Sequence, residues 1–180
     1  REFRARRSAL HAAHPEAAVL AATHWPAGLG PFTAAALYAP TGSEVDPRPL
    51  GLVLGREGCR LCLPVVTELG APLAFRPWTA GEPLVPDALG MAAPGREAEA
   101  MTPDVVVTPL LAFDRSGGRM GQGGGYYDRT IEQLRAKGRV FVLGLAFAGQ
   151  EVEKLPAEDH DQPLDAVLTE AGFRLFAKDR

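Results

Sequence analysis

Six glycines lie between Gly117 and Gly125, and one arginine, Arg119, lies among them. Each glycine costs backbone entropy on folding, so an ordinary turn has no need of so many. Glycines do let successive backbone N–H groups converge on an anion, and a guanidinium can bind phosphate oxygens in a bidentate manner. The segment therefore predicts a phosphate-binding loop, and a flexible surface loop is the alternative.

The flanking residues place this loop between a strand and a helix. Residues 104–108 are Asp-Val-Val-Val-Thr, a β-branched run typical of a buried parallel strand. Residues 127–137 have helical spacing, because Tyr127, Ile131 and Leu134 fall on one face. The start of this helix would add its partial positive charge to the loop.

The known nucleotide-binding motifs do not match the loop. No Lys-Ser/Thr pair follows the glycines, and Gly121 and Gly123 lack the third glycine of the dinucleotide motif. The pattern thus indicates phosphate without identifying the ligand.

Three carboxylates are further candidates for chemistry. Asp128 lies in the first turn of the predicted helix, where a carboxylate either complements the helix dipole or binds a metal ion. Asp161 lies in a polar loop, where hydrogen bonding within the loop and metal binding are both open. Glu44 follows a short apolar strand at residues 34–38, and the carboxyl ends of strands are where α/β sheets bind ligands. Taken alone, Glu44 would more often be a surface charge.

The remaining pattern predicts an alternation of strands with helical or irregular connections. Helices are expected at residues 1–13, 15–22 and 50–56, and strands at residues 34–38, 60–66, 73–78, 140–147 and 166–169, the last strand of the chain. Residues 81–103 are rich in Pro, Gly, Ala and Glu, which favours an irregular surface connection. We therefore expect an α/β fold: a single-domain, three-layer sandwich over residues 1–180 with a mostly parallel, Rossmann-like sheet and an N-terminal helical segment over about residues 1–25.

The two cysteines and one tryptophan are interpreted as core residues. Cys59 and Cys62 have a redox or metal spacing, but no second Cys or His pair is near in sequence and residues three apart on a strand point to opposite faces. They are expected to be free core thiols. Trp78 could stack on a ring, but packing is favoured.

Composition excludes several classes of function. The 180 residues are 46% hydrophobic, enough for one sizeable core, and the net charge of −3 does not suggest a nucleic-acid partner. No apolar run reaches the length of a membrane helix, and no signal peptide is visible. A soluble, cytoplasmic monomer is expected. Because the sequence opens at Arg1 rather than Met, residues are expected to precede it.

The sequence resembles the family of 5-formyltetrahydrofolate cyclo-ligase, also called 5,10-methenyltetrahydrofolate synthetase. The similarity is dense from Val105 to Glu170 and weaker from Tyr38 to Asp46. Its most specific part is Gly-Arg-Met-Gly-Gln-Gly-Gly-Gly-Tyr-Tyr-Asp-Arg at residues 118–129. Supporting matches are Ala-Phe-Asp at residues 112–114, Gly-Leu-Ala-Phe at residues 144–147, Gln150 and residues 161–170.

The resemblance implies an ATP-dependent ligase with Mg²⁺ as cofactor and ATP as co-substrate. It implies that the catalytic residues are Arg119 and Tyr127. It implies that ATP is bound by Arg119, Met120, Gly121, Gln122, Gly123, Gly124, Gly125, Tyr126 and Tyr127. It implies that 5-formyltetrahydrofolate is bound by Glu44, which would hold the pterin, and by Gln122, Gly123, Gly124, Gly125 and Tyr126. It implies that Mg²⁺ is bound by Asp128 and Asp161.

Other interpretations stay open at this point. Arg4, Arg6 and Arg7 could meet ATP phosphates, as a basic N-terminal segment does in the family, but a solvated helix face is favoured. His160 is interpreted as a loop residue that orients Asp161 rather than as a general base. A non-catalytic folate or nucleotide-binding module of the same fold is the alternative function, and a sugar-phosphate isomerase or transferase that works without ATP is a third.

Overall fold

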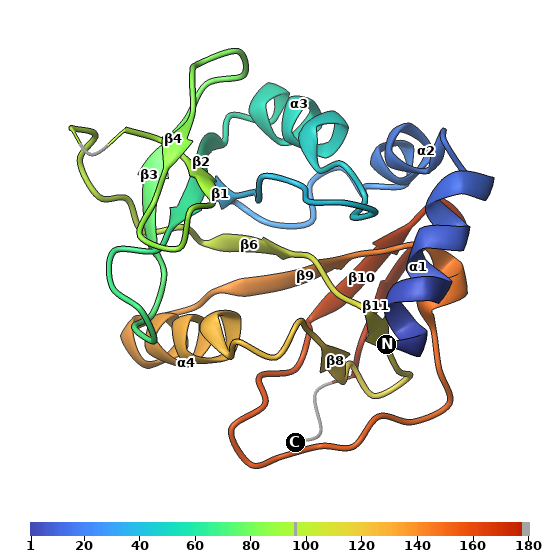
Figure 1. Cartoon of the computed structure of the whole chain (residues 1–180). Helices are drawn as coiled ribbons and strands as arrows, with labels where there is room; N and C mark the ends of the chain where they lie inside the picture. Colours follow the sequence, from blue (N-terminus) through green and yellow to red (C-terminus); the bar gives the residue numbers. More distant parts are fainter. Residues whose placement is uncertain (96, 178–180) are drawn as a thin grey trace.

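A seven-stranded sheet forms the centre of the structure, a computed structural model that describes residues 1–95 and 97–177. Its strands lie in the order β11-β10-β9-β6-β1-β2-β3 (Figure 1). The neighbours from β10 to β2 are parallel, whereas β11 and β3 run antiparallel at the two edges. These strands are β1 (Ala34–Ala36), β2 (Arg60–Val65), β3 (Ala74–Pro77), β6 (Val105–Thr108), β9 (Phe141–Leu145), β10 (Ala166–Thr169) and β11 (Gly172–Leu175). The predicted α/β fold with a mostly parallel sheet is confirmed.

Helices cover both faces of this sheet. In Figure 1, α2 and α3 lie above the sheet, α4 lies below it, and α1 lies beside the sheet. They are α1 (Glu2–Ala13), α2 (Ala17–Thr23), α3 (Arg48–Arg56) and α4 (Tyr126–Lys137), with a short 3-10 helix, η1 (Ala148–Gln150), which α1 contacts. One apolar cluster fills the space under α2 and α3, and a second fills the space under α4. The predicted three layers are therefore present.

The strand residues alternate between the two clusters, as the two-residue period of a strand requires. Val105 and Val107 pack under α2 and α3, whereas Val106 packs under α4. Cys59 and Cys62 also divide between the two clusters, and both thiols are free and buried. Burial raises the pKa of Cys62 to about 12, so this thiol is unreactive at neutral pH. The interpretation of both cysteines as core thiols is confirmed.

Three short pairings depart from the sequence expectation. The strand at residues 166–169 is not the last, because β11 turns back and pairs with it. Residues 81–103 are not wholly irregular, because β4 (Val85–Pro86) and β5 (Ala92–Ala93) form a small hairpin. A similar hairpin joins β7 (Ala112–Phe113) to β8 (Arg119–Met120). Pairings of two residues, or an edge strand with exposed side chains, leave no apolar alternation in the sequence to reveal them.

The connections diverge at the carboxyl ends of β1 and β6, which are neighbours in the sheet. From β1 the chain crosses through α3 to β2 on one side, and from β6 it crosses through α4 to β9 on the other side. Such a topological switch point leaves a crevice between the two outgoing loops, and ligands of open α/β sheets bind there. The two loops carry Glu44 and the glycine-rich segment.

Candidate functional site

The loop after β6 begins with a hairpin that Asp114 holds together. This buried carboxylate accepts hydrogen bonds from the Ser116 hydroxyl at 2.6 Å and from three backbone amides, those of Ser116, Gly118 and Leu155, at 2.9 Å each. Burial alone would raise the pKa of Asp114, but these hydrogen bonds outweigh it and lower the pKa below its ordinary value. Asp114 thus fixes the turn that presents Arg119 on β8.

The glycine loop itself, residues 121–125, presents a row of unused amides. In the described part of the chain, none of these five backbone N–H groups donates a hydrogen bond. Gly123 and Gly125 have φ angles of +94° and +64°, which side chains disfavour, and α4 begins directly after Gly125. Unused amides at the start of a twelve-residue helix form an environment suited to an anion.

Arg119 lies against this loop with its side chain only 3% exposed. One terminal nitrogen is 2.5 Å from Asp128 Oδ1, and the guanidinium carbon is 5.9 Å from the centre of the Tyr127 ring. Its Nε is buried and has no hydrogen-bond partner in the described residues. A buried donor without a partner costs free energy unless a ligand satisfies it, so Arg119 is held ready for an acceptor.

Asp128 and the loop of Asp161 are brought together. The backbone N–H of Gln162, the residue after Asp161, donates to Asp128 Oδ1 at 3.2 Å, while Asp128 Oδ2 has no partner among the described residues. Asp161 accepts a hydrogen bond from the Glu158 amide. His160 is exposed and lies 3.3 Å from Glu158, so the expectation that it orients Asp161 is wrong.

Glu44 lies across the crevice and is tied to the glycine loop. Its side chain is 5% exposed, and its Oε1 accepts a hydrogen bond from Gln122 Nε2 at 3.1 Å. Its Oε2 accepts one from the Thr41 amide at 2.9 Å. The structure therefore joins two residues that lie 78 positions apart in the chain and that the resemblance assigned to one substrate.

Arg7 lies in the site, and the expectation that it belongs to a solvated helix face is wrong. The expected solvated face would expose Arg7, but its side chain is 7% exposed and lies 3.5 Å from Glu44 Oε1. It also donates to Ser43 Oγ and to the carbonyl of Leu110, each at 3.2 Å. The sequence does contain a signal of this burial, because Phe3, Arg7 and Leu10 have the spacing of residues on one core-facing side of a helix. Arg4 and Arg6 are exposed, as expected.

Three tyrosines border the site, and two of them, Tyr38 and Tyr127, stay protonated at neutral pH. Burial and the nearby Glu44 carboxylate raise the pKa of Tyr127 and of Tyr38, and the Tyr38 hydroxyl donates to the carbonyl of Val45. Neither hydroxyl can serve as a base, but each can donate a hydrogen bond. The Tyr126 hydroxyl accepts a hydrogen bond from the Gly70 amide at 3.3 Å, which ties the β2–β3 loop to the glycine loop.

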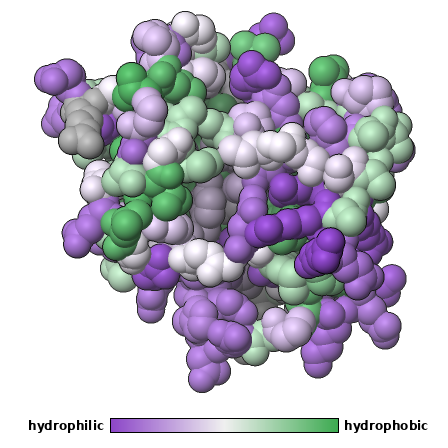
Figure 2. Space-filling model, viewed as in Figure 1, coloured by the Kyte–Doolittle hydropathy of each residue, from purple (hydrophilic) through white to green (hydrophobic). Residues whose placement is uncertain are grey.

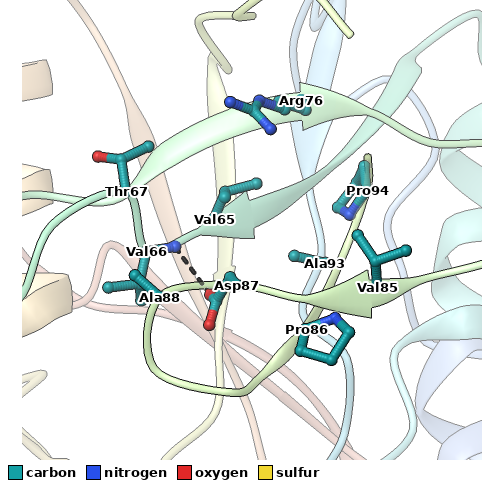
Figure 3. A pocket seen from close by; sticks show the side chains of 10 residues that line it. All are labelled: Val65, Val66, Thr67, Arg76, Val85, Pro86, Asp87, Ala88, Ala93 and Pro94. Atoms are coloured by element: carbon teal, nitrogen blue, oxygen red, sulfur yellow. Dashed lines mark hydrogen bonds between the residues drawn. The ribbon is translucent and has the colours of Figure 1, made fainter. Parts of the chain in front are cut away.

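A cavity of about 180 Å³ extends the same edge of the sheet to the carboxyl end of β2. Its wall comes from the end of β2, from β3 and from the β4–β5 hairpin (Figure 3). Asp87 holds the hairpin there by accepting a hydrogen bond from the Val66 amide at 2.8 Å. Large apolar side chains are exposed nearby, and hydrophobic residues gather at the left of Figure 2, over β3 and β4. The cavity thus offers a ligand apolar side chains together with two charged groups, the Arg76 guanidinium and the Asp87 carboxylate.

Two other candidate residues, Met120 and Trp78, make contacts that are typical of structural residues. Met120 is half-buried on β8, and its carbonyl accepts a hydrogen bond from the Leu111 amide at 2.7 Å. Trp78 packs against the cluster under α2 and α3, so the expectation of packing is confirmed.

The chain is similar to known proteins along most of its length. Residues 29–170 match the sequence model of the 5-formyltetrahydrofolate cyclo-ligase family. A 5-formyltetrahydrofolate cyclo-ligase of Escherichia coli K12 is 38% identical over 139 residues, which are 74% of this chain and 76% of that protein. One of Mycolicibacterium smegmatis is 36% identical over 143 residues, covering 73% and 71%.

Solved structures show the same fold. The NMR structure of a 5,10-methenyltetrahydrofolate synthetase from Aquifex aeolicus superposes with a TM-score of 0.70 at 28% identity, covering 97% of this chain and 84% of that one. A 5,10-methenyltetrahydrofolate synthetase from Mycoplasma pneumoniae superposes with a TM-score of 0.67 at 21% identity, covering 94% and 99%, and supports the fold alone.

Proposed function

Because the chain belongs to the 5-formyltetrahydrofolate cyclo-ligase family, we propose that it converts 5-formyltetrahydrofolate to 5,10-methenyltetrahydrofolate, with ATP converted to ADP and phosphate. The observation that carries the ATP part of this proposal is the row of unused amides at residues 121–125, beside the unpartnered Nε of Arg119. A polyphosphate would satisfy both sets of donors at once.

The chemistry needs positioning and charge neutralisation more than a base. The formyl oxygen attacks the γ-phosphorus and ADP leaves. N10 then attacks the activated carbon, loses its proton, and phosphate departs. The attacking oxygen carries no proton, so the first step needs no general base, which fits a site in which the Tyr38 and Tyr127 hydroxyls stay protonated. The glycine amides and Arg119 would stabilise the charge on the transferred phosphoryl group.

Glu44 is the proposed partner of the pterin. A buried carboxylate is a natural acceptor for the ring N–H groups, and the amide N–H of Gln122 occupies one of its oxygens in this structure. Arg7 donates to the same oxygen, Oε1, and the Thr41 amide donates to the other oxygen, Oε2, so that the carboxylate is held in place. The pterin would therefore lie between the loop after β1 and the glycine loop, within reach of the phosphates. Tyr126 borders the same loop and would contact both substrates.

Asp128 and Asp161 are the proposed ligands of Mg²⁺, and their setting fits this ion. Among the described residues no group of three or more acidic, His or Cys side chains is arranged to hold a metal ion, but Mg²⁺ is usually held by one or two carboxylates with phosphates and water. Asp128 has an oxygen without a partner and lies beside the loop of Asp161. Mg²⁺ would neutralise phosphate charge there.

We expect Asp128→Asn to raise the Mg²⁺ concentration that gives half-maximal activity by about tenfold, because one anionic ligand is lost. Initial rates would be measured across a Mg²⁺ titration at saturating ATP. Glu132→Gln, which neutralises an exposed carboxylate on the same helix, is the matched control. An unchanged titration curve for Asp128→Asn would argue against a metal ligand at this position.

The decisive experiment for the function is a turnover assay. Purified protein with 5-formyltetrahydrofolate and MgATP should produce the absorbance of 5,10-methenyltetrahydrofolate, and omission of ATP should abolish it. Binding of either substrate without any absorbance change would favour the non-catalytic binding module instead. Turnover that persists without ATP would favour an isomerase or transferase.

The proposed setting is a cytoplasmic monomer that uses small-molecule substrates and no nucleic acid. Across the described ranges, the helices are too short or too polar to cross a membrane. Sedimentation of the purified protein with and without MgATP would test the monomer.

A further inference from the structure

Arg129, in the first turn of α4, reaches back over the glycine loop. Its terminal nitrogen Nη2 donates a hydrogen bond to the Gly124 carbonyl at 2.8 Å, and its guanidinium carbon lies 5.2 Å from the centre of the Tyr126 ring. That ring is itself held by the hydrogen bond from the Gly70 amide to its hydroxyl. The arginine is therefore fixed between an anchored ring and one carbonyl of the loop.

This hydrogen bond determines where the next amide points. The Gly124 carbonyl and the Gly125 N–H belong to one trans peptide, in which the two bonds point in opposite directions. A guanidinium that holds the carbonyl on one side turns the N–H to the other side. That N–H donates to no described residue and lies at the start of α4, where an anion is stabilised.

The loop is shaped to admit this arginine. A Cβ at Gly125 would come within 2.6 Å of Arg129 Nη1, and the φ angle of Gly125 is +64°. The positive φ angle therefore favours glycine at residue 125, and a side chain there would also have to displace the end of the arginine that lies over it.

We propose that Arg129 is a positioning residue for nucleotide binding: by holding the Gly124 carbonyl it aims the Gly125 amide at the phosphates of ATP. The inference rests on the proposed function, because the glycine loop must be the phosphate site. The Nε of Arg129 is also buried without a partner among the described residues, so direct binding of phosphate by Arg129 is the alternative that the experiment must distinguish from action through the peptide.

The test reads individual amides in protein labelled with ¹⁵N-glycine and titrated with MgATP, so it needs no turnover. In the wild type, MgATP should shift the Gly123 and Gly125 resonances. In Arg129→Ala, saturating MgATP should still shift Gly123, but the Gly125 shift should be lost and the Kd for MgATP should rise about tenfold. Arg139→Ala, which removes an exposed arginine just beyond the same helix, should behave as the wild type.

The remaining outcomes distinguish a failure of the positioning role of Arg129 from a failure of the proposed phosphate site. An unchanged Gly125 shift in Arg129→Ala overturns the positioning role, and if Kd still rises, Arg129 binds phosphate directly. If MgATP shifts no glycine in the wild type, the phosphate site itself is wrong and the positioning role falls with it. If MgATP binds as proposed and Arg129→Ala binds equally well, only the positioning role fails.

A double-mutant cycle independently tests the coupling between Gly125 and Arg129. Gly125→Ala should weaken MgATP binding partly by displacing Arg129. The combined variant with Arg129→Ala should therefore lose less affinity than the sum of the two single losses. Additive losses would overturn the coupling. Urea unfolding of each variant checks that the fold is retained.

Discussion

Arg119 combines burial, an ion pair with Asp128 and one N–H without a partner. A buried donor normally has a partner, so the buried, unused Nε of Arg119 needs an explanation, as does that of Arg129 over the same loop. Arg135 differs because its side chain is 27% exposed and its terminal nitrogens donate to Gln162, Pro163 and Asp165. At the scale of single residues, this contrast is the strongest argument for a catalytic role.

We expect Arg119→Ala to lower kcat/KM by about 3 kcal/mol, or roughly two orders of magnitude, because a preorganised donor to the transition state is lost. The rate of methenyltetrahydrofolate formation measures this. The midpoint of urea unfolding should show that the fold is retained, and Arg139→Ala is the control for the loss of a surface arginine. Near-normal turnover of Arg119→Ala would refute the role.

Asp114 is a structural carboxylate whose contribution should depend on pH. Its folded-state pKa lies below the ordinary value of 3.8, because its hydrogen bonds from Ser116, Leu155 and Gly118 outweigh the effect of burial. A lowered folded-state pKa adds stability that is fully present above 3.8 and is lost as the pH falls through the folded-state pKa.

We expect Asp114→Asn to reduce the free energy of unfolding by about 1–3 kcal/mol at pH 7, because buried amides lose a charged acceptor. The difference from the wild type should shrink as the pH falls below 3.8 and through the lower folded-state pKa, where the folded wild-type carboxylate becomes protonated. Urea unfolding between pH 7 and pH 2.5 would measure it, with the exposed Glu153→Gln as control. A difference that stays constant over this range would contradict the assignment.

At the scale of elements, the site depends on α1 as well as on the loops after β1 and β6. Arg7 spans from α1 to Glu44 in the first loop and to the Leu110 carbonyl in the second. Gln150 of η1 reinforces the second loop by donating to the carbonyls of Leu110 and Leu111. The N-terminal helix therefore clamps both sides of the crevice.

We expect Arg7→Ala to reduce the free energy of unfolding by on the order of 3 kcal/mol, because it leaves the buried Glu44 carboxylate without its cation. It should also raise KM for 5-formyltetrahydrofolate more than KM for ATP, since Glu44 loses its support. Arg4→Ala, one turn earlier and exposed, is the matched control. Equal effects of the two substitutions would contradict a specific role of Arg7 in supporting Glu44.

At the scale of the whole molecule, one sheet lies between the two apolar clusters and contributes side chains to both. Trp25 packs in the cluster under α2 and α3, and its indole N–H donates to Glu57 at 3.0 Å. The strands that carry this cluster on one face carry the other cluster on the opposite face. Loss of either cluster would expose the sheet, which supports the prediction of one cooperative domain, still to be tested.

We expect urea unfolding followed by tryptophan fluorescence and by far-UV circular dichroism to give coincident transitions, because the fluorescence reports the two tryptophans and the dichroism reports all elements. MgATP should move both transitions to higher urea concentration by the same amount. Two separated transitions would show that the chain unfolds in more than one unit.

The sequence alone determined the features that depend on neighbours along the chain. The β-branched run at residues 104–108 predicted a buried parallel strand, and the glycines from Gly117 to Gly125 predicted a loop between that strand and the following helix. Both follow from local composition, since side-chain periodicity and backbone freedom are properties of short segments. The fold class followed from the alternation of such segments.

Only the tertiary structure decided which polar groups meet. Arg7 became a buried partner of Glu44, Gln122 was brought to the same carboxylate, and Arg129 was laid over Gly124. The strand β11 also escaped prediction, because backbone pairing needs no apolar side chains. A buried polar residue satisfies its hydrogen bonds with whatever the fold places beside it, and residues far apart in the chain leave no trace of that partnership in a local pattern.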